Sequence, residues 1–504
     1  MTATTVHAQT EAGCLQGLRL GAVNAFLGIP YAAAPVGDLR WRSPRPCAPW
    51  SGVRKAIQFG ASAWQPVEPQ GFGPWTSEFV VAGQISEDCL FLNVWAPADR
   101  LASLRPVLVW IHGGAFVEGS GSVPIYDGQA LAEQGVVVVT INYRLGVLGF
   151  FAHPDLAGES GSPCGYGNFG LQDQMAALRW VQANIAAFGG DPDAVTIAGQ
   201  SAGAVSVHML VASASAQGLF HRAIAQSGPP ELLPVAERAQ AVANSLAFAA
   251  EVGALDLPGL RALSVETLTH RLGKSLRFGP MVDGQVLTAW PPHLNTSQRG
   301  LAVPMIVGQT MDENSGLDPD YGSDDPARLS ALLQRHAGAG TPAWLERHLA
   351  PSSGGGGQAY RAASLDRWLA ALWRWAEQRG EPAGAPLFAY LFDHVLPGPQ
   401  ADRYGSFHTS DVPYALGTLG ALSGRPLGAL DHAISAKIQG YWLDFVRHGD
   451  PNGPGRPVWP EFKHSAPVQL RLGATTSAEP MFDASTVVAL GQYFKQGGSA
   501  TVLG

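Results

Sequence analysis

Runs of consecutive apolar residues alternate along the chain with segments in which apolar residues recur every three or four positions. The runs predict buried strands at residues 105–112, 135–143, 194–199, 303–310 and 387–394. Continuous apolar runs, unlike alternating ones, are typical of strands covered on both faces, as in parallel sheets. The pattern therefore predicts an α/β fold around a mostly parallel sheet.

The segment between the second and third runs, "LQDQMAALRWVQANIAAFGGDP", has the apolar spacing of one helix face. Gly189, Gly190 and Pro192 are expected to end that helix. Strand, helix and strand in this order are typical of a right-handed crossover unit. The region of about 320–385 differs, because helical stretches are separated there by "PSSGGGG". We interpret this region as a helical insertion or cap, with the four glycines in a surface loop.

The chain has 504 residues, so we expect one large catalytic fold with insertions, or several packed domains. Charged residues make up 14% and the net charge is −8, without a basic cluster, which argues against a nucleic-acid partner. The longest apolar runs have strand length and fall far short of a membrane span. The amino terminus shows no pattern of a secretion signal.

The four cysteines show no CxxC spacing, so we expect no metal site. Four thiols in so long a chain do not suggest a disulfide framework. A reduced, cytoplasmic setting is the prediction that follows.

The sequence GQSAG, residues 199–203, joins an apolar strand to a helix-compatible stretch. A GxSxG motif alone has a high false-positive risk. In a strand–turn–helix setting, however, it predicts a nucleophile elbow, in which Ser201 has a strained backbone and glycines at both flanks avoid collisions. The plain alternative is that Ser201 caps the helix. The setting favours the nucleophile.

A second glycine motif follows the first apolar run directly, in "WIHGGAFVEGSG". Gly113, Gly114 and Ala115 can turn their backbone N–H groups toward a ligand and, with the N–H of Ala202, would form an oxyanion hole. Loss of one such donor typically costs about 10²–10³ in rate. The plain alternative is a turn that ends the strand. The flanking residues His112 and Phe116 are expected to line or support the site.

These motifs, in order, resemble the type-B carboxylesterase family of the α/β-hydrolase fold. The resemblance spans almost the whole chain and implies a single unit over residues 1–504, with a large central, mostly parallel sheet, flanking helices and helical insertions. The matching stretches are "GIPYAAAPVGDLRWRSPRP", "SEDCLFLNVW", "WIHGGAF", "NYRLGVLGF", "GNFGLQDQMAALRWVQANIAAFGGDP", "VTIAGQSAGA", "AIAQSG" and "PMVDG".

The resemblance also implies the remaining members of a catalytic triad. The family's acid lies in a segment that matches "VGQTMDENSG", which implies Glu313, with Asp312 as the alternative. The family's histidine lies in a segment that matches "GSFHTSDVPY", which implies His408 as the base, while His112 is its main rival. Thr409 and Asn314 both stand where the family has glycine.

Other matches imply structural roles. In relatives the arginine of "LRW" pairs with the glutamate of "SEDC", which implies an Arg40–Glu87 pair, and Arg144 is likewise expected to pair with Asp173. Ser227 in "QSG" is expected to buttress the triad.

Two further positions depart from the family. Its cysteine in "EDC" often forms a disulfide with one about 25 residues earlier, but Trp64 stands near the expected position, so Cys89 lacks that partner. Most close relatives have glutamate where this chain has Gln200. We hypothesise that Gln200 makes the pocket less negative, weakens a preference for cationic substrates and gives less support to a charged His408.

The function that follows is a serine hydrolase that cleaves carboxylic esters through an acyl-enzyme, without a metal or organic cofactor. Aromatic residues near the motifs favour a small, neutral and fairly hydrophobic ester, although such residues are more often core. The protein is expected to be a monomer or small homo-oligomer without a membrane or nucleic-acid partner. An amide, carbamate or thioester hydrolase would use the same triad. A non-catalytic, cholinesterase-like binding protein is the remote alternative.

Overall fold

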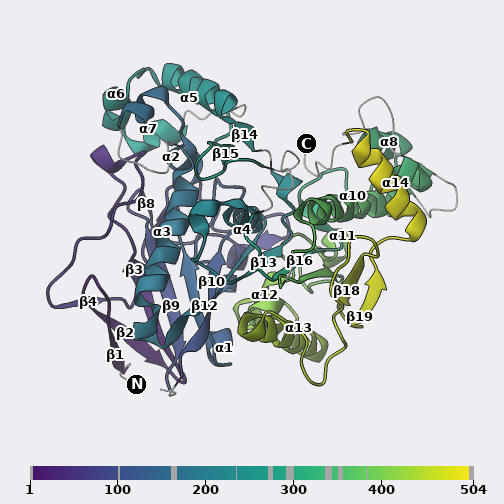
Figure 1. Cartoon of the computed structure of the whole chain (residues 1–504), viewed down its shortest axis with the longest axis horizontal. Coiled ribbons are helices and arrows are strands. Elements are labelled where there is room, and N and C mark those ends of the chain that lie inside the picture. Colours follow the sequence, from purple (N-terminus) through teal and green to yellow (C-terminus); the bar gives the residue numbers. More distant parts are fainter. Residues whose placement is uncertain are drawn as a thin grey trace. The chain divides into compact units, whose positions relative to one another are not determined.

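The computed structural model describes residues 4–99, 103–159, 167–233, 235–270, 276–290, 300–334, 343–349, 356–382 and 384–498. The chain divides into two compact units (Figure 1). The first comprises Met1–Ala223 and Pro234–Trp290, and the second comprises Ile224–Leu233 and Pro291–Gly504. None of the described helices is both long and apolar enough to cross a lipid bilayer.

The first unit is built on strands that run parallel where the chain is most apolar and antiparallel toward the amino terminus. β10 pairs in parallel with β11 and β12, whereas β1, β2, β3, β9 and β11 pair antiparallel in that sequence. All five residues of β11 are buried, as expected for a strand covered on both faces. The hydrogen-bonded order of the strands in this unit is β1 (Thr5–Gln9), β2 (Cys14–Leu20), β3 (Val23–Pro30), β9 (Phe91–Pro97), β11 (Val137–Ile141), β10 (Arg105–Ile111) and β12 (Gly190–Gln200), with β4 (Val53–Lys55) beside β2.

The five predicted apolar runs all form strands, namely β10, β11, β12, β16 and β17. The antiparallel strands at the amino terminus were not predicted, because β1 and β2 have few buried residues and because Asn24 and Asn93 interrupt the apolar runs of β3 and β9. In β1 only Ala8 is buried. Short two-stranded pairs complete this unit: β5 (Ser62–Ala63) with β8 (Ile85–Ser86), β6 (Gly71–Phe72) with β7 (Trp75–Thr76), and β14 (Ala236–Glu237) with β15 (Met281–Val282).

The helices of the first unit cover these strands. The predicted crossover helix is α3, which continues into a short 3-10 turn and ends at Gly189, whose φ of 81° is the left-handed conformation common after a helix. Both α3 and α4 pack on β12. The helices are α1 (Gln129–Ala132), α2 (Gly146–Phe150), α3 (Phe169–Asn184), α4 (Ala202–Ala212), α5 (Arg238–Val252), α6 (Leu257–Ala262) and α7 (Val265–His270).

The second unit has its own strand order. It runs from β13 (Arg222–Gln226), whose last three residues belong to this unit, through β16 (Met305–Thr310), β17 (Leu387–Phe392) and β18 (Val468–Leu472) to β19 (Ser477–Pro480). β16, β17 and β18 are parallel, and β19 is antiparallel to β18. The helices are α8 (Pro326–Gln334), α9 (Ala343–Glu346), α10 (Gly356–Arg379), α11 (Ala401–Tyr404), α12 (Val412–Ala415), α13 (Ala429–His448) and α14 (Ala484–Lys495).

The helical region predicted near 320–385 holds α8, α9 and α10. The expectation that all four glycines of "GGGG" lie in a loop was wrong for the last two. Gly356 and Gly357 begin α10, where the first backbone N–H groups need partners outside the helix. The N–H of Gly357 donates to Asp324 at 2.7 Å. The first two glycines of the run lie outside the described residues.

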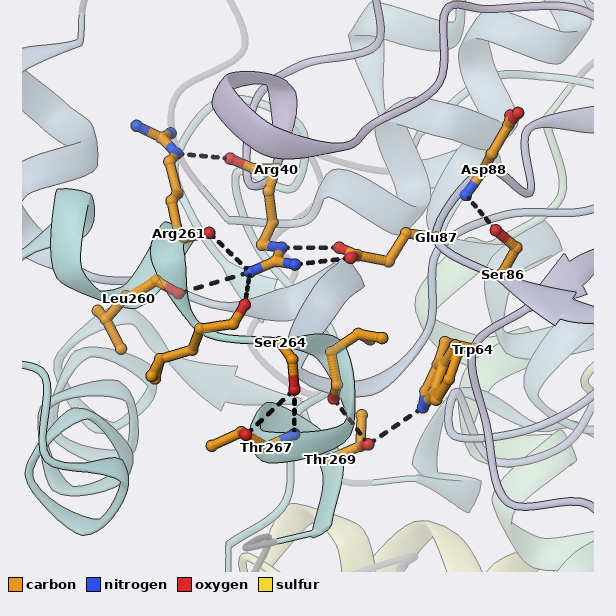
Figure 2. A network of polar contacts seen from close by, with 12 residues as sticks. Arg40, Trp64, Ser86, Glu87, Asp88, Leu260, Arg261, Ser264, Thr267 and Thr269 are labelled. Carbon is orange, nitrogen blue, oxygen red and sulfur yellow. Dashed lines mark hydrogen bonds and ion pairs between the residues drawn. The ribbon is translucent and has the colours of Figure 1, made fainter.

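Both predicted ion pairs of the first unit are formed. Arg144 binds Asp173 in a fork, with two N–O distances of 2.7 Å, and both side chains are almost completely buried. Arg40 binds Glu87 in the same way, at 2.7 and 2.6 Å (Figure 2). Such bidentate geometry gives the strongest hydrogen bonds available to an arginine.

Arg40 also fixes the end of α6. Its guanidinium donates to the carbonyl oxygens of Arg261 at 3.2 Å and Leu263 at 2.8 Å, and Arg261 in return donates to the carbonyl oxygen of Arg40 at 3.0 Å. A second fork joins Arg261 to Glu159. Figure 2 shows Arg40 and Arg261 side by side, each donating to the backbone oxygen of the other.

Replacing one partner of the Arg144–Asp173 pair is expected to destabilise the protein strongly. Asp173→Asn leaves a buried guanidinium without its counter-charge, so the free energy of unfolding should fall by about 3–5 kcal/mol. Thermal and urea unfolding followed by circular dichroism measure the loss. The control is Asp320→Asn, whose partner Arg328 is 55% exposed, with an expected loss below about 1 kcal/mol. Equal losses in the two variants would contradict the prediction.

Candidate active site

Ser201 lies at the sharp turn between β12 and α4. Its backbone has φ 56° and ψ −125°, a conformation that a residue with a side chain rarely adopts. A methyl group on Gly203 would lie 2.1 Å from the carbonyl oxygen of Ile111, and one on Gly199 would lie 2.6 Å from the backbone of Gly203. The two glycines are therefore required on steric grounds, as the sequence predicts for a nucleophile elbow.

The predicted oxyanion loop lies directly against this elbow, within the same unit. A methyl group on Gly113 would lie 2.7 Å from the carbonyl oxygen of Gln200 and 3.1 Å from the Cβ atom of Ser201. Gly114, Ala115 and Phe116 all have positive φ, of 103°, 53° and 62°. Three such residues in succession form a turn, closed by bonds from the N–H groups of Val117 and Glu118 to the carbonyl oxygen of Gly114, and Ala115 itself is exposed. The N–H of Ala202 starts α4 beside them.

His112 is completely buried behind this loop. Its ring stacks on Tyr143, with a centroid distance of 4.4 Å, and its Nδ1 atom lies 2.8 Å from the carbonyl oxygen of Gly113. Because a carbonyl only accepts, Nδ1 carries the proton of this bond. Burial lowers the pKa of His112 to about 4. The ring is therefore neutral, and its contacts are those of a support for the loop.

Gln200 and Phe116 are also buried. The side-chain oxygen of Gln200 faces Gly113, so that an amide, and not a carboxylate, lies beside the loop. Phe116 packs edge-on against Phe150 at 5.3 Å. Its backbone oxygen accepts a bond of 2.7 Å from the N–H of Gly146. Phe116 thus anchors the loop in the core.

In the second unit, Glu313 and His408 form a hydrogen bond between Oε2 and Nδ1, and both are buried. The other carboxylate oxygen of Glu313 accepts a bond of 2.8 Å from the N–H of Thr310, which fixes the carboxylate. The alternative acid, Asp312, is bound instead to the hydroxyl of Tyr321 at 2.7 Å and the N–H of Ser406 at 2.9 Å. The structure therefore brings His408 together with Glu313.

A third acid in this unit was missed from the sequence. Asp411 is buried, accepts bonds from Tyr390 at 2.6 Å and Gln226 at 3.0 Å, and has its pKa raised to about 6, mainly by burial and further by Glu313. Its position three residues after His408 was the available signal.

The departures from the family near this pair have structural counterparts. Thr409, where glycine was expected, keeps a left-handed φ of 87°. Asn314 holds α10 through bonds to Ser364 at 3.0 Å and Trp368 at 3.1 Å. The hydroxyl of Ser227 has no hydrogen-bond partner among the described residues, so its expected role as a buttress of the triad stays a prediction.

A cavity of about 60 Å³ lies beside the oxyanion loop. Gly113 and Gly114 form one wall, and the residues after β5, including Gln65 and Glu68, form another. Glu118 also lines it, and burial raises the pKa of Glu118, with the charge of Glu68 adding to the effect. A larger cavity of about 600 Å³ in this unit contains none of the predicted site residues.

A strand–serine–helix elbow that packs against a glycine loop at the ends of parallel strands defines an α/β-hydrolase. The chain belongs to the carboxylesterase family, whose model matches residues 3–336 and 367–487. It is a carboxylic ester hydrolase with a large, mostly parallel central sheet flanked by helices.

Named relatives agree with this assignment. The chain is 36% identical to the phenmedipham hydrolase of Pseudarthrobacter oxydans, over 92% of this chain and 94% of that one. It is 34% identical to the para-nitrobenzyl esterase of Bacillus subtilis, over 93% and 95%. The crystal structure of the Geobacillus stearothermophilus carboxylesterase EST55 has a TM-score of 0.81 at 34% identity, over 96% and 99%.

Gly203→Ala is expected to disrupt the elbow. Its methyl group would meet a backbone oxygen of β10, so stability should fall by about 1–3 kcal/mol and ester hydrolysis should be lost or strongly reduced. The melting temperature and p-nitrophenyl acetate hydrolysis measure these effects. Gly279→Ala is the control, because a methyl group there meets nothing within 4 Å. A Gly203→Ala enzyme with normal activity and stability would refute the steric argument.

Proposed function

We propose that Ser201, Glu313 and His408 form the catalytic triad of this carboxylesterase. The observation that carries the proposal is the strained backbone of Ser201, which only the elbow geometry requires. The bond between Glu313 and Nδ1 of His408 supports it, because a carboxylate accepts, so that Nδ1 carries the proton and Nε2 has the lone pair of a base. Gly113, Gly114, Ala115 and Ala202 provide the N–H donors of the oxyanion hole.

The reaction follows from these roles. His408 accepts the hydroxyl proton of Ser201 while the oxygen attacks the ester carbonyl. The N–H donors of the loop stabilise the oxyanion, and Glu313 stabilises the imidazolium. His408 then gives the proton to the leaving alcohol, and an acyl-enzyme remains. Water, activated by the same histidine, releases the acid and restores Ser201.

Ser201→Ala should abolish labelling by a fluorophosphonate probe and reduce ester hydrolysis by at least about 10³-fold. Mass spectrometry of the labelled peptide and hydrolysis of a p-nitrophenyl ester measure both effects. The control is Ser485→Ala, an exposed serine at the start of α14, which should leave both unchanged. Labelling that persists in Ser201→Ala would overturn the assignment of the nucleophile.

We propose small, neutral and fairly hydrophobic esters as substrates. Phe72, Phe79 and Tyr126 line the cavity beside the oxyanion loop, which supports an apolar substrate group. The carboxylates of Glu68 and Glu118 line the same cavity and would repel an anionic ester. A panel of p-nitrophenyl esters, anilides, carbamates and thioesters tests the preference for an ester bond over the alternatives that share this machinery.

The remaining proposals concern setting and architecture. We propose a cytoplasmic monomer or small homo-oligomer, with the helices of residues 320–385 as an insertion or cap. The free thiols of Cys14, Cys47 and Cys89 support a reducing compartment.

Gln200→Glu is expected to raise the apparent pKa that governs kcat/KM. A carboxylate near the base stabilises the imidazolium, so a higher pH is needed to deprotonate His408. Activity at low pH should therefore fall. The same change should favour cationic over neutral esters. A pH profile measured with both ester types is the test, and Gln200→Met is the uncharged control. If neither the profile nor the ester preference changes, Gln200 has no electrostatic role.

A further inference from the structure

Gln65 binds both backbone groups of Gly119. Its side-chain oxygen accepts a bond of 2.7 Å from the N–H of Gly119, and its Nε2 donates to the carbonyl oxygen of the same residue at 2.9 Å. Nε2 also donates to the carbonyl oxygen of Ala63 at 2.9 Å. Gln65 itself is 4% exposed. A buried amide that satisfies one residue's donor and acceptor fixes that residue in both position and orientation.

Gly119 is the point at which the oxyanion loop closes. A methyl group on Gly119 would lie 2.3 Å from Nδ1 of His112 and 2.4 Å from the carbonyl oxygen of Gly113. The N–H of Glu118 donates to the carbonyl oxygen of Gly114 at 3.0 Å. The loop from 113 to 119 is thus a closed turn, and any shift of Gly119 is passed to the backbone that carries the N–H donors.

The residues that precede Gln65 are themselves held in place. β5, which ends just before Trp64, pairs with β8, and the hydroxyl of Ser62 donates to that of Ser120 at 2.9 Å. In addition, Nε1 of Trp64 donates to the hydroxyl of Thr269 on α7 at 3.1 Å (Figure 2). The backbone from which the side chain of Gln65 extends is therefore held in place.

We propose that Gln65 is a positioning residue for the oxyanion hole, supported from α7 through Trp64. It touches no reacting atom and acts through Gly119. The proposal rests on the assignment of Gly113, Gly114 and Ala115 to the oxyanion hole. Removing the bonds between Gln65 and Gly119 should weaken the stabilisation of the transition state. Ground-state binding of the ester should stay almost unchanged, because the N–H donors of the oxyanion hole act mainly on the developing oxyanion.

The first test is Gln65→Met, which keeps the side-chain length and removes both bonds to Gly119. We expect kcat to fall about 10- to 100-fold, the range for small misplacements of catalytic groups, with KM within about threefold of the wild type. Affinity for a trifluoromethyl ketone, which forms an oxyanion on Ser201, should fall by the same factor as kcat/KM.

The second test is Gln65→Glu, which gives a pH signature. The ionised carboxylate can accept from the N–H of Gly119 but repels its carbonyl oxygen, whereas the protonated form regains an O–H donor. The ratio of mutant to wild-type kcat should therefore rise as the pH falls. If Gln65→Glu caused only a structural defect, and the bonds between Gln65 and Gly119 had no role in positioning, this ratio would stay constant with pH.

Matched controls separate positioning from general loss of stability. Gln182→Met removes a comparable amide of α3, which donates to the carbonyl oxygens of Pro192 and Leu219, and should lower the melting temperature without lowering kcat. Thr269→Val should lower kcat in the same direction as Gln65→Met but less, while Thr267→Val on the same helix should not. Normal kcat in Gln65→Met, or equal kcat losses in Gln65→Met and Gln182→Met, would overturn the proposal. Full activity of Ser201→Ala would instead refute the proposed triad.

Discussion

The left-handed backbone of Ser201 is the constraint on which the candidate site depends. It costs about 1–3 kcal/mol in a residue with a side chain and persists only where the surroundings impose it. Here β12 and α4 are both buried, and the turn between them is pressed against the end of β10 at Ile111. The same close approach brings Gly113 to within contact of Gln200, so that one packing requirement positions both the proposed nucleophile and the loop proposed to supply the N–H donors.

Part of the backbone strain lies in or near the segments of the proposed site, while Trp41, Asn168 and Gln400 with positive φ lie elsewhere. Among the described residues, the non-glycine positions with positive φ include Ala115, Phe116, Ser201, Ser227 and Thr409. They lie in the loop of residues 113–119, at the elbow, directly after β13 and directly after His408. The structure around these segments is regular. It consists of buried parallel strands and bidentate ion pairs such as Arg144–Asp173. A rigid frame of this kind is what allows strained loops to remain ordered.

Much of this structure could be predicted from hydrophobic patterns and motifs in the sequence. The strands β10 to β12, the elbow at Ser201 and the partner of Arg40 follow from short-range signals or family register. Gln65 did not, because an amide that binds a backbone 54 positions away leaves no pattern in the sequence. The strands β1 and β2 were missed because few of their residues are buried, and β3 and β9 because Asn24 and Asn93 interrupt their apolar runs.

The exchange of bonds between Arg40 and Arg261 has a consequence for local opening. Each arginine donates to the backbone of the other, and each is forked to a carboxylate, Glu87 or Glu159. No single bond of this set can be released without straining the rest. We therefore expect the end of α6 and the segment around residue 40 to open cooperatively, so that their amide hydrogens exchange with solvent together.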